Sequence, residues 1–233
     1  MLQLDNLFWI AVIMGLFGLA ILIVLWPGKK HGKRLLKRWG VAEPDAGEVE
    51  LAVRYLKRRR LWYPWLFLAI PPLLENETLA GSIFATLLLG GLIAELLAQR
   101  PSRGPRREAV LAPRTLRGIV PIWVLVVSGL AAAGSVAHLA LTARWKLLAV
   151  AAGAVVICAV ITALALRRPA VGAPRVDLAL RCRSARVAIG LGIAACTVIG
   201  WPAGNFGSFL VVVAGLAAFL AVTAPVKRLP AAA

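Results

Sequence analysis

Residues 7–26 read LFWIAVIMGLFGLAILIVLW, and residues 27–39 read PGKKHGKRLLKRW. The first stretch carries no charge, and its length matches the roughly 20 helical residues that cross a hydrocarbon layer about 30 Å thick. No basic segment precedes it and no small-residue cleavage site follows it, so we expect a retained membrane helix rather than a cleaved signal peptide. The second stretch holds a block of Lys and Arg, and this alternation of apolar run and basic block continues along the chain.

The overall composition agrees with that pattern. Of 233 residues, 61% are hydrophobic, which exceeds the roughly 45–50% of soluble domains. A formal charge of +17 would otherwise favour a nucleic-acid partner. The charges stand in blocks between apolar runs instead of covering a surface. We therefore predict an all-α membrane protein, a single transmembrane domain over residues 1–233, with no nucleic-acid partner.

Seven apolar runs are candidate transmembrane helices. They are Leu7–Trp26, Leu61–Leu74, Leu79–Leu97, Ile119–Leu141, Leu147–Leu166, Val187–Trp201 and Phe206–Ala224. The second and sixth runs are short, and the second contains Pro71-Pro72. A re-entrant hairpin is one alternative for the second run. The other is a helix that begins in the preceding basic segment, with its arginines reaching back to the interface.

The distribution of Lys and Arg predicts the orientation. Of the 27 Lys and Arg residues, 25 fall in residues 27–60, 99–118 and 167–186 and in the C-terminal tail. Because cytoplasmic loops are enriched in these residues, we assign those segments to the cytoplasm and the N-terminus to the outside. Tryptophans near the ends of the predicted spans suit the headgroup layer. The expected location is the cytoplasmic (inner) membrane of a bacterium.

Two of the predicted cytoplasmic loops resemble each other. One begins Leu97-Ala98-Gln99-Arg100-Pro101 and the other Leu166-Arg167-Arg168-Pro169, and a weaker third copy contains Leu51-Ala52-Val53-Arg54. The pattern predicts one lead helix followed by three αα-hairpins. Each unit contains two crossings, so the copies would be parallel rather than inverted repeats. With its Ala/Leu-rich spans and short external turns, the chain resembles uncharacterised multi-pass membrane proteins of actinobacteria. That resemblance implies a location and a lineage and implies no activity.

The basic segments contain two predicted surface helices. Asp45-Ala46-Gly47-Glu48 fits a capping box, and the apolar residues Val49, Ala52, Val53 and Leu56 follow at helical spacing. Lys29–Trp39 is predicted to be a basic helix lying on the membrane surface and attracted to anionic headgroups. Its cations are Lys29, Lys30, Lys33, Arg34, Lys37 and Arg38. Topology and lipid anchoring account for these charges, and a docking surface for a cytoplasmic or membrane protein is the alternative.

Few polar groups fall inside the predicted spans. They are Glu95, Ser128, Ser135, His138, Thr162 and Thr197. Together they could line a polar path, although hydroxyls that bond a carbonyl one turn back would explain the Ser and Thr residues equally well. Glu95 lies about one turn before Arg100 and is expected to pair with it or reach the interface. His138 is expected near the outer membrane surface.

Motifs that carry chemistry are missing from the sequence. Cys158 and Cys196 stand in apolar runs and Cys182 in a basic segment, and the chain has only two histidines, so we predict no metal ligands, cofactor or catalytic residues. Three functions remain open. The first is a non-catalytic accessory or regulatory component that docks a partner through its basic cytoplasmic face. The second is a small-solute transporter or channel, and the third is an intramembrane enzyme using Glu95 or His138 as acid or base.

Overall fold

The structure is a computed structural model that describes residues 2–70, 79–99, 116–167, 173–201 and 204–225. Over these ranges the chain forms helices and no strand, which confirms the predicted all-helical class. The helices are α1 (Leu2–Val24), α2 (Lys29–Arg38), α3 (Ala46–Arg60), α4 (Tyr63–Ala69), α5 (Leu79–Ala98), α6 (Leu116–Ile119), α7 (Ile122–Leu141), α8 (Trp145–Arg167), α9 (Pro174–Gly200) and α10 (Phe206–Thr223).

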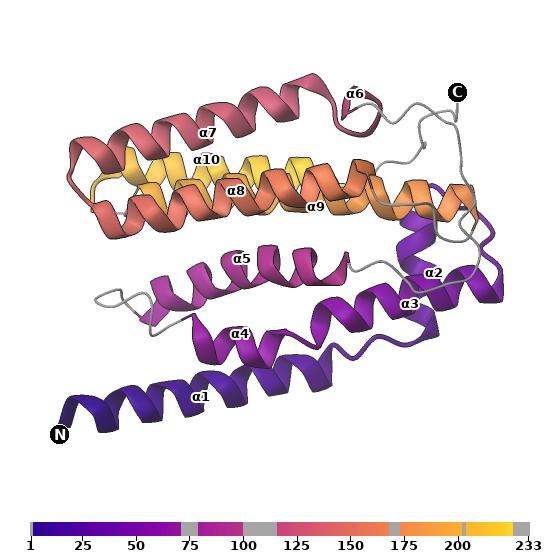
Figure 1. Ribbon diagram of the computed structural model, residues 1–233, viewed down its shortest axis with the longest axis horizontal. Helices are drawn as coiled ribbons and strands as arrows, with labels where there is room; N and C mark the ends of the chain where they lie inside the picture. Colours follow the sequence, from indigo (N-terminus) through magenta and orange to yellow (C-terminus); the bar gives the residue numbers. More distant parts are fainter. Residues whose placement is uncertain (1, 71–78, 100–115, 168–172, 202–203, 226–233) are drawn as a thin grey trace.

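Within the described part of the chain, four helices, α7 to α10, are long and apolar enough to cross a membrane. They run along a common direction, and α5, α4 and α1 extend the assembly on one side (Figure 1). Helix α9 contacts α5, α7, α8 and α10, whereas α1 is connected to the rest mainly through α4. The helices therefore pack in the order α1, α4, α5 and α9, with α7, α8 and α10 around α9.

Helix α9 is the centre of this packing. In its most apolar stretch 94% of the residues are buried, compared with 17–22% of the residues in the corresponding stretches of α7, α8 and α10. Small residues allow the neighbours to approach closely, as is usual between membrane helices. A Cβ atom at Gly200 would lie 2.1 Å from Ser135 Oγ, and one at Gly190 would lie 2.7 Å from Thr223 Cγ2. Glycine is therefore required at both positions for this approach.

The structure corrects the boundary predicted for the sixth span. We expected a short span over Val187–Trp201 preceded by a cytoplasmic segment over residues 167–186, but α9 is continuous from Pro174 to Gly200. Pro174 suits the first turn of a helix because it has no N–H to leave unbonded, and Asp177 complements the positive end of the helix dipole there. Three arginines of that predicted segment, Arg181, Arg183 and Arg186, are thus buried in the first half of α9.

The second predicted span, Leu61–Leu74, is only partly described. Helix α3 ends at Arg60, and α4 has 7 residues, which is about 10 Å at 1.5 Å per residue. Helix α4 packs against α1, where the rings of Phe17 and Phe67 meet edge to face at 5.6 Å. Residues 71–78, with Pro71-Pro72, and residues 100–115 and 168–172, where most of the predicted repeat lies, fall outside the described residues.

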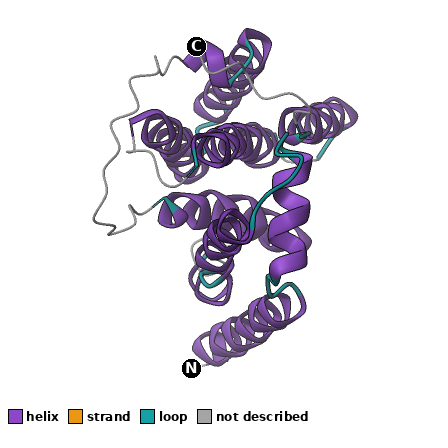
Figure 2. Cartoon of the chain, turned by 90° about the vertical axis from the view of Figure 1, so that its right-hand side faces the viewer, coloured by secondary structure: helices purple, strands orange, loops and turns teal. Residues whose placement is uncertain are grey.

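Helix α2 lies across one end of the other helices. When the molecule is viewed along the bundle, most helices are seen end-on and α2 is seen from the side (Figure 2). Its apolar side joins a second hydrophobic core formed with α3 and the start of α9. The main members of this core are Leu36, Trp39, Ala52, Tyr55, Leu56, Val176, Ala179 and Cys182. The fold therefore has a small second core, built from α2, α3 and the start of α9, at one end of a long apolar bundle.

Candidate functional site

All the cations predicted on the basic helix α2 lie on the surface of the molecule. Lys29, Lys30, Lys33, Arg34, Lys37 and Arg38 are each exposed. On the opposite side Leu36 is fully buried and Trp39 is 5% exposed. Burial of that apolar side fixes the direction in which the cations point. The result is a dense positive surface at one end of the molecule.

Helix α3 supports α2. The predicted capping box is confirmed, with the Asp45 carboxylate accepting from the Glu48 N–H at 2.7 Å and the Glu48 carboxylate accepting from the Asp45 N–H at 2.9 Å. The two helices approach closely at Gly32, where a Cβ atom would lie 2.8 Å from the carbonyl oxygen of Val49. The predicted apolar side of α3 is buried against α2 and the neighbouring core. Capping and close packing together hold α2 in place.

Glu95 is the centre of a buried polar network. Its side chain is fully buried on α5, and its Oε1 atom accepts hydrogen bonds from Ser184 Oγ at 2.6 Å and from the Tyr55 hydroxyl. Its Oε2 atom lies 3.1 Å from Arg59 Nε and 3.9 Å from Arg183 Nη1. Glu95 therefore pairs with Arg59 and Arg183, and its expected partner Arg100 lies outside the described residues.

Tyr55 and Gln99 extend this network. The guanidinium of Arg183 donates to the Tyr55 hydroxyl and lies 5.0 Å from the centre of its ring. Burial raises the pKa of Tyr55 above its ordinary value of 10, so the phenol keeps the proton that it donates to Glu95. Gln99 donates to the Ser184 hydroxyl, which in turn donates to Glu95. The network joins α3, α5 and α9 at the end where α2 lies.

Two other arginines of α9 bind the ends of neighbouring helices. Arg181 pairs with Asp177 at 2.5 Å and donates to the carbonyl oxygens of Ala165 and Leu166 in the last turn of α8. Arg186 donates to the carbonyl oxygen of Val222 in the last turn of α10, at 2.8 Å. The last carbonyls of a helix have no partner within the helix and carry partial negative charge. Buried arginines of α9 satisfy them in two helices.

The residues of the predicted polar path lie in several separate places. Ser128 and Thr162 line one pocket, whereas Glu95 belongs to the network with Arg59 and Arg183. Ser135 packs against Gly200, and Thr197, packed against Gly215, donates to carbonyls of its own helix. His138 stacks on Trp201, with ring centres 4.2 Å apart. Ser128 and Thr162 thus share a pocket, and Ser135 and His138 contact the consecutive residues Gly200 and Trp201.

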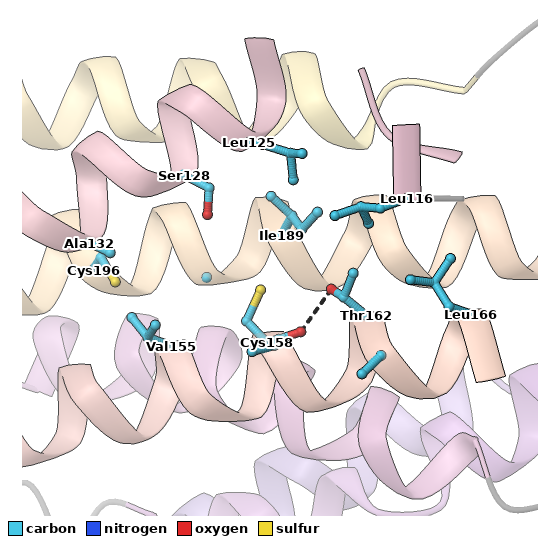
Figure 3. Close-up of a pocket in the computed structure, with 13 residues that line it drawn as sticks. Leu116, Leu125, Ser128, Ala132, Val155, Cys158, Thr162, Leu166, Ile189 and Cys196 are labelled. Carbon is cyan, nitrogen blue, oxygen red and sulfur yellow. Dashed lines mark hydrogen bonds between the residues drawn. The ribbon is translucent and has the colours of Figure 1, made fainter. Parts of the chain in front are cut away.

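The pocket lies between α7, α8 and α9 and has a volume of about 360 Å³ (Figure 3). Its lining is Leu116, Leu125, Ser128, Ala132, Val155, Cys158, Ala159, Thr162, Ala163, Leu166, Ile189, Gly192 and Cys196. Thr162 donates its hydroxyl to the carbonyl oxygen of Cys158 at 2.8 Å. The pocket is therefore apolar, with the Ser128 hydroxyl as its main remaining polar group.

Sequence reasoning missed most of the network. It identified Glu95 but not Tyr55, Arg59, Arg183 or Ser184, which come from helices far apart in the chain. One signal was available, because an acid inside a membrane helix needs a cationic partner. Many arginines flank the predicted spans, and the sequence gives no means of choosing among them.

These features define the class of protein: the described residues form an all-helical structure with four helices long and apolar enough to span a membrane and a charged, internally bonded end. In the part of the chain that the structure describes, no three His, Cys, Asp or Glu side chains gather in a way that could hold a metal ion. No known protein family, curated protein or solved structure matches the chain.

Proposed function

We propose that the chain is a non-catalytic accessory or regulatory component of the bacterial cytoplasmic membrane that docks a partner protein through its basic face. The observation that carries this proposal is the arrangement of α2, whose six cations are exposed while its apolar side is buried. A fixed positive surface steers and orients an acidic partner. Where α2 meets anionic headgroups, each cation would add about 1 kcal/mol of attraction.

The proposed topology has seven crossings, with the N-terminus outside and the C-terminus inside. Helices α1 and α5 have 23 and 20 residues, equivalent to about 34 Å and 30 Å, and would add two crossings to the four candidate spans. The remaining crossing would run through α4. Cytoplasmic placement of α2 follows from the distribution of Lys and Arg, and its position across the bundle end suits a helix at the membrane surface.

Accessibility of single cysteines tests this topology. In a background with the three native cysteines replaced, Lys33→Cys should react with a membrane-impermeant maleimide only after the cells are permeabilised. Arg144→Cys, in the exposed turn between α7 and α8, should react in intact cells. Reaction of Lys33→Cys in intact cells would exclude the proposed orientation, and with it a cytoplasmic docking surface on α2.

Co-purification in a mild detergent tests the docking function. The wild-type chain should retain an acidic partner in fixed stoichiometry. The triple variant Lys30→Glu, Lys33→Glu and Lys37→Glu should lose that partner, because exposed charge pairs become repulsive when one sign is reversed. Arg144→Glu is the matched control. Arg144 lies in the turn after α7, away from α2 (Figure 1), so this variant should retain the partner. A wild-type chain that brings down no stoichiometric partner, or a triple variant that keeps it, would contradict the proposal.

A further inference from the structure

The pocket between α7, α8 and α9 is elongated along the helices. On α8 its lining runs from Val155 to Leu166, a distance of about 16 Å at 1.5 Å per residue. Ile189 and Cys196 of α9 form its floor, and both are buried. Helices α7 and α8 meet at the tight turn after Leu141 and are farther apart towards α6 (Figure 1). The shape suits a chain-like ligand more than a compact solute.

The rim of the pocket faces the region that hydrocarbon would occupy. Ala159 lines the pocket and is itself exposed. The adjoining side of α8 exposes Val156 and Val160, and α7 exposes Val126 and Leu130. In helices that span a membrane, exposed apolar side chains of this kind contact acyl chains. The pocket would therefore be continuous with the acyl-chain layer.

The chemistry of the lining selects an apolar ligand. Among the described residues no charged side chain lines the pocket, and the Thr162 hydroxyl is already bonded to the Cys158 carbonyl. An ion or a strongly polar solute would lose its hydration there without replacement. Apolar lining with one or two polar groups is typical of sites for small hydrophobic ligands. A hydrocarbon chain fits this lining.

One end of the pocket is next to positive charge. Leu166 lines that end, and the next residue, Arg167, is exposed. The carbonyl oxygens of Ala165 and Leu166 accept from Arg181, so a cation already offsets the negative end of α8. We propose that the pocket binds one acyl chain of an anionic bilayer phospholipid, with its headgroup phosphate beside Arg167.

Lipid titration followed by native mass spectrometry tests this site. The full chain in a neutral maltoside detergent is titrated with dioleoylphosphatidylglycerol and, separately, with dioleoylphosphatidylcholine. Ala163→Phe and Ala132→Phe fill the pocket from α8 and α7, and each should weaken phosphatidylglycerol binding by about ten-fold. Arg167→Gln should leave the acyl-chain site open and reduce the preference for phosphatidylglycerol over phosphatidylcholine by about five-fold.

Ala152→Phe is the matched control for the pocket-filling variants. Ala152 is on the same helix, is exposed and lies outside the pocket lining. The control should bind phosphatidylglycerol like the wild-type chain, and thermal unfolding of all variants shows whether each is folded. Equal binding by the control and by both pocket-filling variants would overturn the proposal. So would equal affinity of the wild-type chain for the two lipids. Neither result depends on the docking function of α2.

Discussion

Two regions of this molecule bury helix surface with opposite chemistry. The polar end consists of α2, α3, Gln99 with the C-terminal end of α5, and the first half of α9, residues 174–186. The apolar bundle consists of α7, α8, α10 and the second half of α9, residues 187–200. In the first region buried arginines make hydrogen bonds and ion pairs. In the second region glycine and alanine are buried by close packing of the helices. Charge along a membrane chain therefore does not by itself mark the exposed segments.

The difference has a physical basis. In the apolar bundle lipid competes equally well for apolar side chains, so association depends on close packing of small residues. At the polar end an arginine can satisfy helix carbonyls and a carboxylate at once. Replacing a whole buried ion pair by apolar residues is often neutral, but removing one partner is strongly destabilising. The polar end should therefore tolerate single changes poorly.

The largest expected effect is that of Glu95→Gln. The change leaves the buried Arg183 and the partly buried Arg59 without a carboxylate, and loss of one partner of a buried pair costs about 3–5 kcal/mol of unfolding free energy. Reversible unfolding of the purified chain in mixed detergent micelles measures it. Glu50→Gln is the control, because Glu50 makes an exposed ion pair with Arg54 that should contribute about 0.5 kcal/mol or less. Equal losses in the two variants would show that the network is not a stabilising unit.

Arg186→Met should have the next largest effect. The substitution keeps the apolar stem and removes the donor to the Val222 carbonyl, a charge-assisted bond that contributes about 1.5–3 kcal/mol. Arg175→Met is the control, since Arg175 is an exposed residue in the first turn of the same helix. The same unfolding measurement compares the two. A loss confined to Arg186→Met would establish that an arginine of the polar end stabilises a helix of the apolar bundle.

Close packing in the apolar bundle is tested by Gly200→Ala. The new Cβ atom would lie 2.1 Å from Ser135 Oγ and 3.0 Å from Ser135 Cα, and overpacking of this kind costs about 1–3 kcal/mol. Ser135→Gly in the same chain should recover most of that loss, because it removes the two closest atoms, Oγ at 2.1 Å and Cβ at 2.7 Å. Gly134→Ala is the control, since a Cβ atom there meets nothing within 4 Å. A destabilisation by Gly134→Ala as large as that by Gly200→Ala would refute the packing argument.

The sequence predicted the apolar bundle better than the polar end. Long uncharged runs gave the helical class and the positions of α7, α8 and α10 within a few residues, because membrane thickness dictates helix length. The Asp45–Glu48 capping box was also predicted correctly, since its chemistry is local. Both successes rest on patterns that a short stretch of chain contains in full.

The failures have the opposite character. Arg181, Arg183 and Arg186 were assigned to a segment between two spans, and their burial in α9 was not predicted. The partners of Arg183 and Arg186 lie on α3, α5 and α10, far away in sequence. Arg181 pairs with Asp177 one turn earlier on its own helix and also reaches the last turn of α8. Whether an arginine stays in water or binds a helix end depends on which helix end reaches it. That information belongs to tertiary packing, so no local pattern carries it.

The smallest expected effect tests whether the two regions unfold as one. Asp45→Ala removes the side chain that accepts from the Glu48 N–H, and loss of such a cap costs about 1 kcal/mol. Amide hydrogen exchange should speed up in α3 and α2 and stay unchanged in the second half of α9, if the polar end opens separately. Glu43→Ala, in the exposed loop before the cap, should change neither. Faster exchange throughout α9 in Asp45→Ala would instead mean that the Glu95 network couples the polar end and the apolar bundle into one cooperative unit.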